Sequence, residues 1–192
     1  MANFTSVLDA SILYSAALRD LVLSLAANGL YRPAWSELIH DEWMRNLIAN
    51  HGGGAGIQAH TARTRQRMNA VFPDALIDGF QPLIAGLTLP DAKDRHVLAT
   101  AIHAGAAVIV TYNLRHFPVS ELAKFGIEAW PPDEFVEFLF NAEIDAALDA
   151  IREHRARLRR PPKTQSEYIG MLKNKLQMPR TAQILQTNAS KF

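Results

Sequence analysis

The segment Ala106-Ala-Val-Ile-Val-Thr111 decides the fold class of this chain. Its six residues carry no charge and include four β-branched side chains, which is typical of a strand buried on both faces of a parallel sheet. Gly105 stands just before it, and apolar residues at helical spacing occupy residues 95–104. The segment therefore predicts a helix, a turn and a central buried strand.

Strands and helices alternate on both sides of this segment. Phe4–Leu8 predicts another buried strand, and Leu30–Ala34 and Ile127–Ala129 predict shorter ones. Helices are expected over Leu13–Leu25, Ser36–Ile48, Ile57–Val71, Arg95–Ala104, Leu122–Phe125 and Pro132–Phe140. Such alternation predicts an α/β fold with a mainly parallel central sheet.

The rest of the chain has a different pattern, in which no strand is expected. It predicts a helix over Asn141–Leu158, a break at Arg159-Arg-Pro-Pro-Lys163, a helix from the capping box Thr164-Gln-Ser-Glu167 to about Leu176, a break at Pro179 and a short helix over Thr181–Leu185. The sequence therefore predicts a domain over residues 1–140 and a small all-helical extension over residues 141–192.

The net charge of +1 conceals an asymmetry between these two parts. Residues 1–149 hold 10 Lys/Arg and 17 Asp/Glu, a net charge of −7, whereas residues 150–192 hold 10 Lys/Arg and two Asp/Glu, a net charge of +8. A basic segment next to an acidic body favours either a polyanionic partner or a solvated helical extension held to that body by charge.

The composition excludes several kinds of site. The chain has no cysteine, which excludes disulfides, thiolate zinc sites and cysteine nucleophiles. The first residues show no secretory signal and no apolar run reaches the roughly 18 residues that span a bilayer, so we expect a cytoplasmic protein without a membrane segment. A glycine-rich phosphate loop, a Gly-x-Ser-x-Gly elbow and a His-Glu-x-x-His pattern are absent, and His96 and His103 are expected to be packing or surface residues.

Oxygen-bearing side chains follow two of the predicted strands. Asp9 comes directly after the first strand and Asn113 just after the central one, and sites in parallel α/β sheets form at the carboxyl ends of strands. Glu42 lies in an expected helix, and Asp94, near Asp91, stands at a helix start. Mg²⁺ and Mn²⁺ prefer oxygen ligands, and a carboxylate cluster is repulsive without a cation. Together these residues fit hard-metal chemistry on a phosphodiester.

Each of these residues alone also fits an ordinary structural role. The aspartates suit helix N-caps, Glu42 suits a solvated helix face, and Asn113 suits a turn, and spacing does not establish that the side chains converge. Two other acidic α/β families fit less well. A haloacid-dehalogenase-like phosphatase needs a second Asp that Asp9-Ala-Ser11 lacks, and a receiver domain needs an acidic pair and a phosphorylatable Asp that are not evident.

Four segments resemble the motifs of PIN domains, in the order and spacing of that family. They are Val7–Leu13 with Asp9, Ser36–Trp43 with Glu42, Leu89–Ala99 with Asp94, and Val108–Phe117 with Asn113. Each motif is weak alone, but four in sequence over roughly residues 3–140 are fairly specific. The amide of Asn113 stands where the family usually has a fourth acid.

The resemblance implies a PIN-like three-layer α/β/α fold with a helical C-terminal extension. It points to VapC-like toxin ribonucleases of type II toxin–antitoxin pairs, and so implies Mg²⁺ or Mn²⁺ as cofactor, an RNA substrate such as tRNA or rRNA, a cognate antitoxin and a homodimer. Asn113 brings no charge, which implies weaker occupancy of a second metal position. It leaves open a one-metal mechanism, or a catalytically weak or inactive module that binds RNA or a partner protein.

The resemblance also implies roles for single residues. Asp9 and Asp94 would bind the principal ion, Glu42 would help to hold it or orient the attacking water, and Asn113 would be an outer ligand or a donor to a ligand. Three further residues are candidates for substrate binding, namely Thr111, Arg95 and Arg115. Thr111 would hydrogen-bond a carboxylate or a metal-bound water, although an ordinary role in the strand is the simpler explanation. Arg95 and Arg115 would contact phosphates, and a role as surface charges explains them equally well. The Arg63–Arg67 cluster and the basic extension would supply salt-dependent RNA binding.

Overall fold

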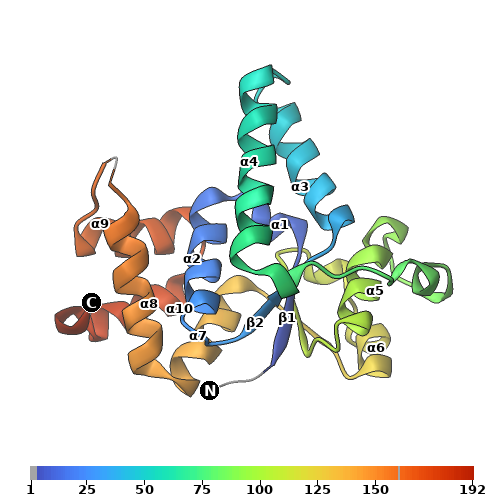
Figure 1. Cartoon of the computed structure of the whole chain (residues 1–192). Helices are drawn as coiled ribbons and strands as arrows, with labels where there is room; N and C mark the ends of the chain where they lie inside the picture. Colours follow the sequence, from blue (N-terminus) through green and yellow to red (C-terminus); the bar gives the residue numbers. More distant parts are fainter. Residues whose placement is uncertain (1–3, 160) are drawn as a thin grey trace. The chain divides into compact units, whose positions relative to one another are not determined.

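The computed structural model of this chain describes residues 4–159 and 161–192 (Figure 1). These residues form two compact units. The first, here named the sheet unit, consists of Phe4–Ser15 and Arg32–Trp130. The second, here named the helical unit, consists of Ala16–Tyr31 and the described residues of Pro131–Phe192. No helix in the described part of the chain is long and apolar enough to cross a membrane.

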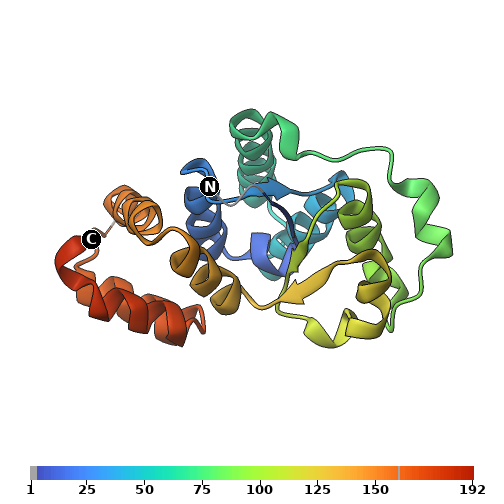
Figure 2. The same cartoon turned by 90° about the horizontal axis from the view of Figure 1, so that it is seen from below.

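The sheet unit is built on four parallel strands in the order β2-β1-β3-β4 (Figures 1 and 2). The strands are β1 (Thr5–Leu8), β2 (Arg32–Ala34), β3 (Val108–Val110) and β4 (Glu128–Trp130). Val7 pairs with Ala34 on one side and with Ile109 on the other, so β1 and β3 are the central strands. Because all strands run the same way, Asp9 and Thr111 follow adjacent strands at the same edge of the sheet.

α-Helices and short 3₁₀ turns complete this unit. The α-helices are α1 (Ala10–Tyr14), α3 (Glu37–Asn50), α4 (Ala55–Val71), α5 (Arg95–His103) and α6 (Val119–Leu122). The 3₁₀ turns are η1 (Pro73–Ala75), η2 (Gln81–Gly86), η3 (Ala92–Asp94), η4 (Leu114–His116) and η5 (Ala123–Phe125). The predicted fold class is confirmed, with a sheet that is parallel throughout.

A buried polar network fixes α3, the helix that carries Glu42. Nδ1 of His40 accepts a hydrogen bond of 3.0 Å from Trp43 Nε1, so the ring proton lies on Nε2, which donates to Asn69 Oδ1 at 3.0 Å. Trp35 Nε1 donates to the same oxygen at 2.9 Å. Burial lowers the pKa of His40, in keeping with a neutral ring. The network ties α3 to α4 and to the end of β2, and so sets the direction in which Glu42 projects.

The helical unit joins one helix from the start of the chain to those at its end. It contains α2 (Ala16–Ala27), α7 (Pro132–Ala142), α8 (Ile144–Arg157), α9 (Gln165–Gly170), the short π-helix η6 (Met171–Lys175), α10 (Pro179–Thr187) and the 3₁₀ turn η7 (Ala189–Lys191). α2 packs along α8, where Arg157 donates a hydrogen bond to Ser24. Asp133 accepts from the backbone N–H groups of Arg180 and Thr181, both at 2.9 Å, and so fixes α7 to the start of α10.

Several predicted boundaries were wrong, each for a local reason. The helix expected over Leu13–Leu25 is two helices, because Ser15 has an extended backbone. Glu143 ends α7, so the following helix begins at Ile144 rather than at residue 141. Pro179 does not end a helix but starts α10, where its missing N–H would have no helical partner.

Other expectations hold or remain open. The capping box at Thr164 is confirmed, and α9 follows it. Arg160, in the predicted break, and residues 1–3 of the predicted domain 1–140 lie outside the described residues. The division at residue 140 stays a prediction, and contacts group α2 with the C-terminal helices.

The pH dependence of stability tests the packing of the helical unit. His154 on α8 is buried, and its Nδ1 lies 2.7 Å from Tyr168 Oη. Burial lowers the pKa of His154 from 6.5 to about 4, so between these pH values the unfolded chain binds a proton that the folded chain does not. We expect this residue to contribute no pH dependence above about pH 6.5 and to lower the free energy of unfolding by about 3 kcal/mol as the pH falls to 4.

Urea unfolding at pH 7 and at pH 4.5 measures this effect. His154→Asn, which keeps a hydrogen-bonding atom near Nδ1, should lose less stability between the two pH values than the wild type does. His51→Asn, at an exposed histidine, should behave like the wild type. An identical loss in wild type and His154→Asn would contradict the assignment.

Candidate metal centre

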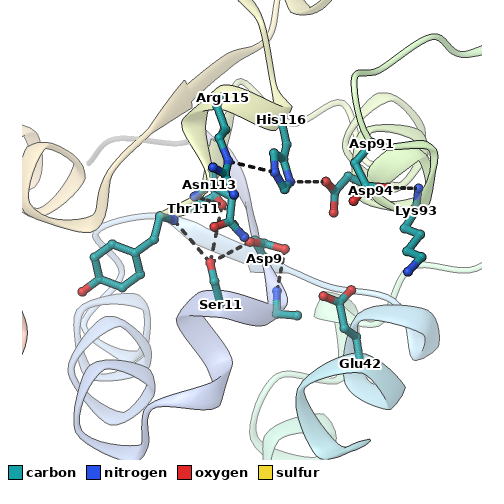
Figure 3. Close-up of polar contacts among 12 residues, drawn as sticks. Asp9, Ser11, Glu42, Asp91, Lys93, Asp94, Thr111, Asn113, Arg115 and His116 are labelled. Carbon is teal, nitrogen blue, oxygen red and sulfur yellow. Dashed lines mark hydrogen bonds and ion pairs between the residues drawn. The ribbon is translucent and has the colours of Figure 1, made fainter. Parts of the chain in front are cut away.

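Asp9 occupies the carboxyl end of β1, next to the end of β3. Its backbone N–H donates to Val110 O at 3.1 Å, and the residue is only 2% exposed. The carboxylate accepts three hydrogen bonds, from Ala10 N at 2.7 Å, Ser11 Oγ at 2.6 Å and Thr111 Oγ1 at 2.7 Å (Figure 3). These donors compensate for burial of the carboxylate and fix its orientation.

The hydroxyl groups of Ser11, on α1, and Thr111, just after β3, join the segments that follow the two central strands. Thr111 Oγ1 donates to Asp9 and accepts from the backbone N–H of Asn113 at 2.9 Å. Ser11 Oγ likewise accepts from the backbone N–H of Tyr112 at 3.3 Å. Asn113 is therefore held beside Asp9 through its backbone, and Figure 3 shows the two residues on the same side of the site.

Asp94 is the last residue of η3 and lies directly before α5. His116 Nδ1 lies 2.7 Å from Asp94 Oδ2, and Arg115 Nε donates to His116 Nε2 at 3.1 Å. Burial raises the pKa of Asp94, the hydrogen bond from His116 opposes this shift, and the negative charges of Asp9 and Asp91 add to it. The carboxylates of Asp9 and Asp94 are thus close enough to repel each other.

Glu42 projects from α3 toward the other two acids, as Figure 3 shows. Its Oε2 lies 3.3 Å from Nε2 of His96 on α5, and its side chain is 30% exposed. Asp9, Glu42 and Asp94 therefore come from three separate elements and face a common space. The structure brings together three of the four candidate site residues through their carboxylates, and the fourth, Asn113, through its backbone.

Helix capping and exposure on a helix surface, the ordinary structural roles expected for these acids, explain only some of their positions. Asp9 caps α1 as well as facing the site, and Asp91 caps η3 by accepting from Lys93 N at 2.9 Å. Asp94 precedes α5, but its side chain makes no capping hydrogen bond. Glu42 pairs with His96 and is partly exposed to solvent. Helix capping therefore does not explain the position of Asp94, and Glu42 is not simply part of a solvated helix face.

The donor set fits a hard divalent cation. Carboxylate oxygens are the preferred ligands of Mg²⁺ and Mn²⁺, and a cation would relieve the repulsion between Asp9 and Asp94. A second grouping overlaps this one, since Asp91, Asp94 and His116 each offer a ligand atom within 4.8 Å of the others. Asp94 belongs to both groupings and is their shared residue.

The candidate substrate-binding residues lie at the site in different ways. Arg115 is engaged with His116, and Thr111 with Asp9. Arg95 starts α5 next to Asp94, and its Nε is buried without a hydrogen-bond partner in the described part of the chain. Their assignment to substrate binding stays a prediction.

Three residues that contact the acids were not among the predicted site residues. Ser11 stands two residues after Asp9, and His116 stands three residues after Asn113. Their closeness in sequence to predicted site residues could have identified both of them. His96 was interpreted as a packing or surface residue, but it pairs with Glu42. Its position two residues after Asp94 could likewise have identified it.

Comparisons with known proteins cover most of the chain. The PIN domain family matches residues 5–115, and the family described as the VapC50 C-terminal domain matches residues 132–187. A protein of Mycobacterium tuberculosis named "Putative ribonuclease VapC50" is 48% identical over 58 residues, which are 30% of this chain and 34% of that protein. The match thus spans about a third of the relative's length. No solved structure matches the chain.

Removal of one hydroxyl group tests how the site is held together. Thr111→Val deletes a donor to the buried carboxylate of Asp9 and the acceptor for Asn113 N, so we expect the free energy of unfolding to fall by about 2 kcal/mol. Urea unfolding at pH 7 with EDTA measures the loss, and Thr111→Ser, which keeps the hydroxyl, is the matched control. A Val variant as stable as the Ser variant would show that the hydroxyl is dispensable.

Proposed function

Since this chain belongs to the PIN-domain family, we propose that it is a Mg²⁺- or Mn²⁺-dependent endoribonuclease and the toxin of a toxin–antitoxin pair. The observation that carries the proposal is the convergence of the carboxylates of Asp9, Glu42 and Asp94 from three elements (Figure 3). Phosphodiester hydrolysis by a divalent ion needs such an oxygen-rich, negatively charged centre.

The relatives support the ribonuclease and toxin parts of this proposal. The name of the M. tuberculosis protein describes a ribonuclease, and the VapC50 C-terminal family covers residues 132–187 of this chain. We propose by extension that the chain acts on a structured RNA such as tRNA or rRNA in the cytoplasm. A cognate antitoxin protein and a homodimeric state belong to the same proposal.

We propose the following role for each residue of the site. Asp9 and Asp94 would hold the ion, and the hydroxyl groups of Ser11 and Thr111, which donate to Asp9, would keep its carboxylate in the required orientation. Glu42 helps to hold the ion or orients the attacking water. When bound, the ion supplies charge neutralisation at the phosphate and activation of that water. Hydrolysis would form a bond from the water oxygen to phosphorus and break the bond to the leaving ribose oxygen. The attacking water would release a proton to solvent, and the leaving oxygen would take one up from solvent.

Asn113 sets the number of charges at the centre. With an amide at this position the site has three carboxylates, so it favours one tightly held ion over two. The presence of an amide at position 113, where the family usually has an acid, also supports a second candidate function. This is a catalytically weak or inactive module that binds RNA or a partner protein. Metal-dependent turnover separates the two functions, because only the nuclease cleaves RNA.

The arginines of α4 form a candidate surface for the RNA backbone. The helix has no acidic residue, and its buried side chains are Thr61 and Met68. Arg65 pairs with Glu37 at 2.6 Å, whereas Arg63 and Arg67 are exposed, one turn apart and without an ion pair in the described part of the chain. We propose that these two arginines contact phosphates, which gives salt-dependent and sequence-independent binding.

A cleavage assay on total RNA tests the catalytic proposal. Wild type should cleave with Mg²⁺ or Mn²⁺ and stop with EDTA. Asp9→Asn, Asp94→Asn and Glu42→Gln should each lower the rate by roughly 100-fold or more, because each weakens the charge that holds the ion. Asp41→Asn, at an exposed acid next to Glu42 on α3, should cleave like the wild type. Equal rates for wild type and Asp9→Asn would refute the site.

The salt dependence of RNA binding tests the surface on α4. With EDTA present to prevent cleavage, Arg63→Gln/Arg67→Gln should reduce the slope of log K against log salt concentration by roughly 1.4, about 0.7 for each lost phosphate contact on single-stranded RNA. Arg65→Gln, at the arginine paired with Glu37, is the control and should change the slope less. An unchanged slope in the double variant would place the phosphate contacts elsewhere.

A further inference from the structure

A chain of two hydrogen bonds ends on the acid shared by both possible ligand groups. Arg115 Nε donates to His116 Nε2 at 3.1 Å, and His116 Nδ1 lies 2.7 Å from Asp94 Oδ2 (Figure 3). Arg115 and His116 stand on η4, just after Asn113, while Asp94 stands 22 residues earlier in sequence than His116. The loop that follows β3 thus reaches across the site to the turn that carries Asp94.

The donor at the start of this chain determines the tautomer of the histidine. A guanidinium group has no acceptor, so His116 Nε2 must accept the hydrogen bond from Arg115. The hydrogen of a neutral imidazole then lies on Nδ1, which donates to Asp94. In this arrangement neither ring nitrogen of His116 is free to bind a cation.

The hydrogen bond also divides the two oxygens of Asp94 between two tasks. Oδ2 accepts from His116, which leaves Oδ1 for a cation. Asp94 makes no capping hydrogen bond, so the donor from His116 is what orients its carboxylate in the described structure. Because the centre has an amide at position 113, fewer carboxylates share the task of holding an ion, and the orientation of each matters more.

We propose that His116 is a positioning residue that orients Asp94 as a ligand for the divalent ion, and that Arg115 fixes the tautomer of His116 required for this. The proposal rests on the proposed function, because it presumes that Asp94 is a ligand. Partners of this kind raise metal affinity by about 10- to 100-fold in other proteins.

Titration with Mn²⁺, followed by the loss of the free-ion EPR signal, tests the proposal without any measurement of activity. His116→Leu, which removes the donor, should weaken Mn²⁺ binding by about 10- to 100-fold. His116→Asn, whose amide nitrogen lies near the position of Nδ1, should bind more tightly than the Leu variant. Arg115→Lys keeps the charge but lacks the Nε donor, and should weaken binding by less than His116→Leu does. His51→Leu, at an exposed histidine, controls for loss of a histidine.

The spectrum of bound Mn²⁺ separates orientation from direct ligation. An oriented Asp94 predicts no directly coordinated nitrogen in the wild type. A nitrogen hyperfine coupling that disappears in His116→Asn would overturn the proposal and make His116 a ligand beside Asp91 and Asp94. Equal Mn²⁺ affinity in His116→Leu and wild type would also overturn it, provided that urea unfolding shows both to be folded.

The acid variants keep this result distinct from a failure of the proposed function. If Asp9→Asn and Asp94→Asn bind Mn²⁺ like the wild type, the metal centre itself is wrong, and the proposed role of His116 falls with it. If they lose Mn²⁺ while His116→Leu keeps it, the centre stands and only the role of His116 is refuted.

Discussion

The hydrogen bond from Thr111 to the carboxylate of Asp9 joins residues that are 102 positions apart in the sequence. It forms only when β1 and β3 lie side by side in parallel, so the same pairing that builds the core of the sheet also assembles the site. Asn113, Ser11 and Tyr112 take their places through the two hydroxyl groups at this junction. The geometry of the centre therefore depends on strand pairing, and loop conformation follows from it.

Each acid at the centre is held by a partner of its own. Asp9 has three donors, Asp94 has His116, and Glu42 has His96. Bringing carboxylates together in a partly buried space is unfavourable, and these partners offset that cost without neutralising the cluster. Glu42 depends in addition on the buried network at His40, two residues before it on the same helix. The protein thus keeps the side chains oriented and leaves the repulsion for a cation to relieve.

Much of this could be predicted from the sequence, because uncharged β-branched runs such as that before Tyr112 and an acid at a strand end have local signatures. The roles of His96 and His116 could not, since each depends on a contact between elements that no periodicity reveals. The 3₁₀ turns between residues 73 and 86 were missed because such short turns have no repeat to detect. The grouping of α2 with the C-terminal helices was likewise hidden, because it is a matter of long-range packing.

The chain leaves the sheet unit after Ser15, returns at Arg32 and leaves again after Trp130. The helical unit is therefore discontinuous in sequence, with α2 encoded between two neighbouring strands of the sheet. A gene shortened after residue 140 would still encode α2 but not α8, against which it packs. The basic C-terminal region therefore belongs to the same folded unit as α2. Its loss or exchange would lower the free energy of unfolding of that unit, which the loss of an independently folded domain would not do.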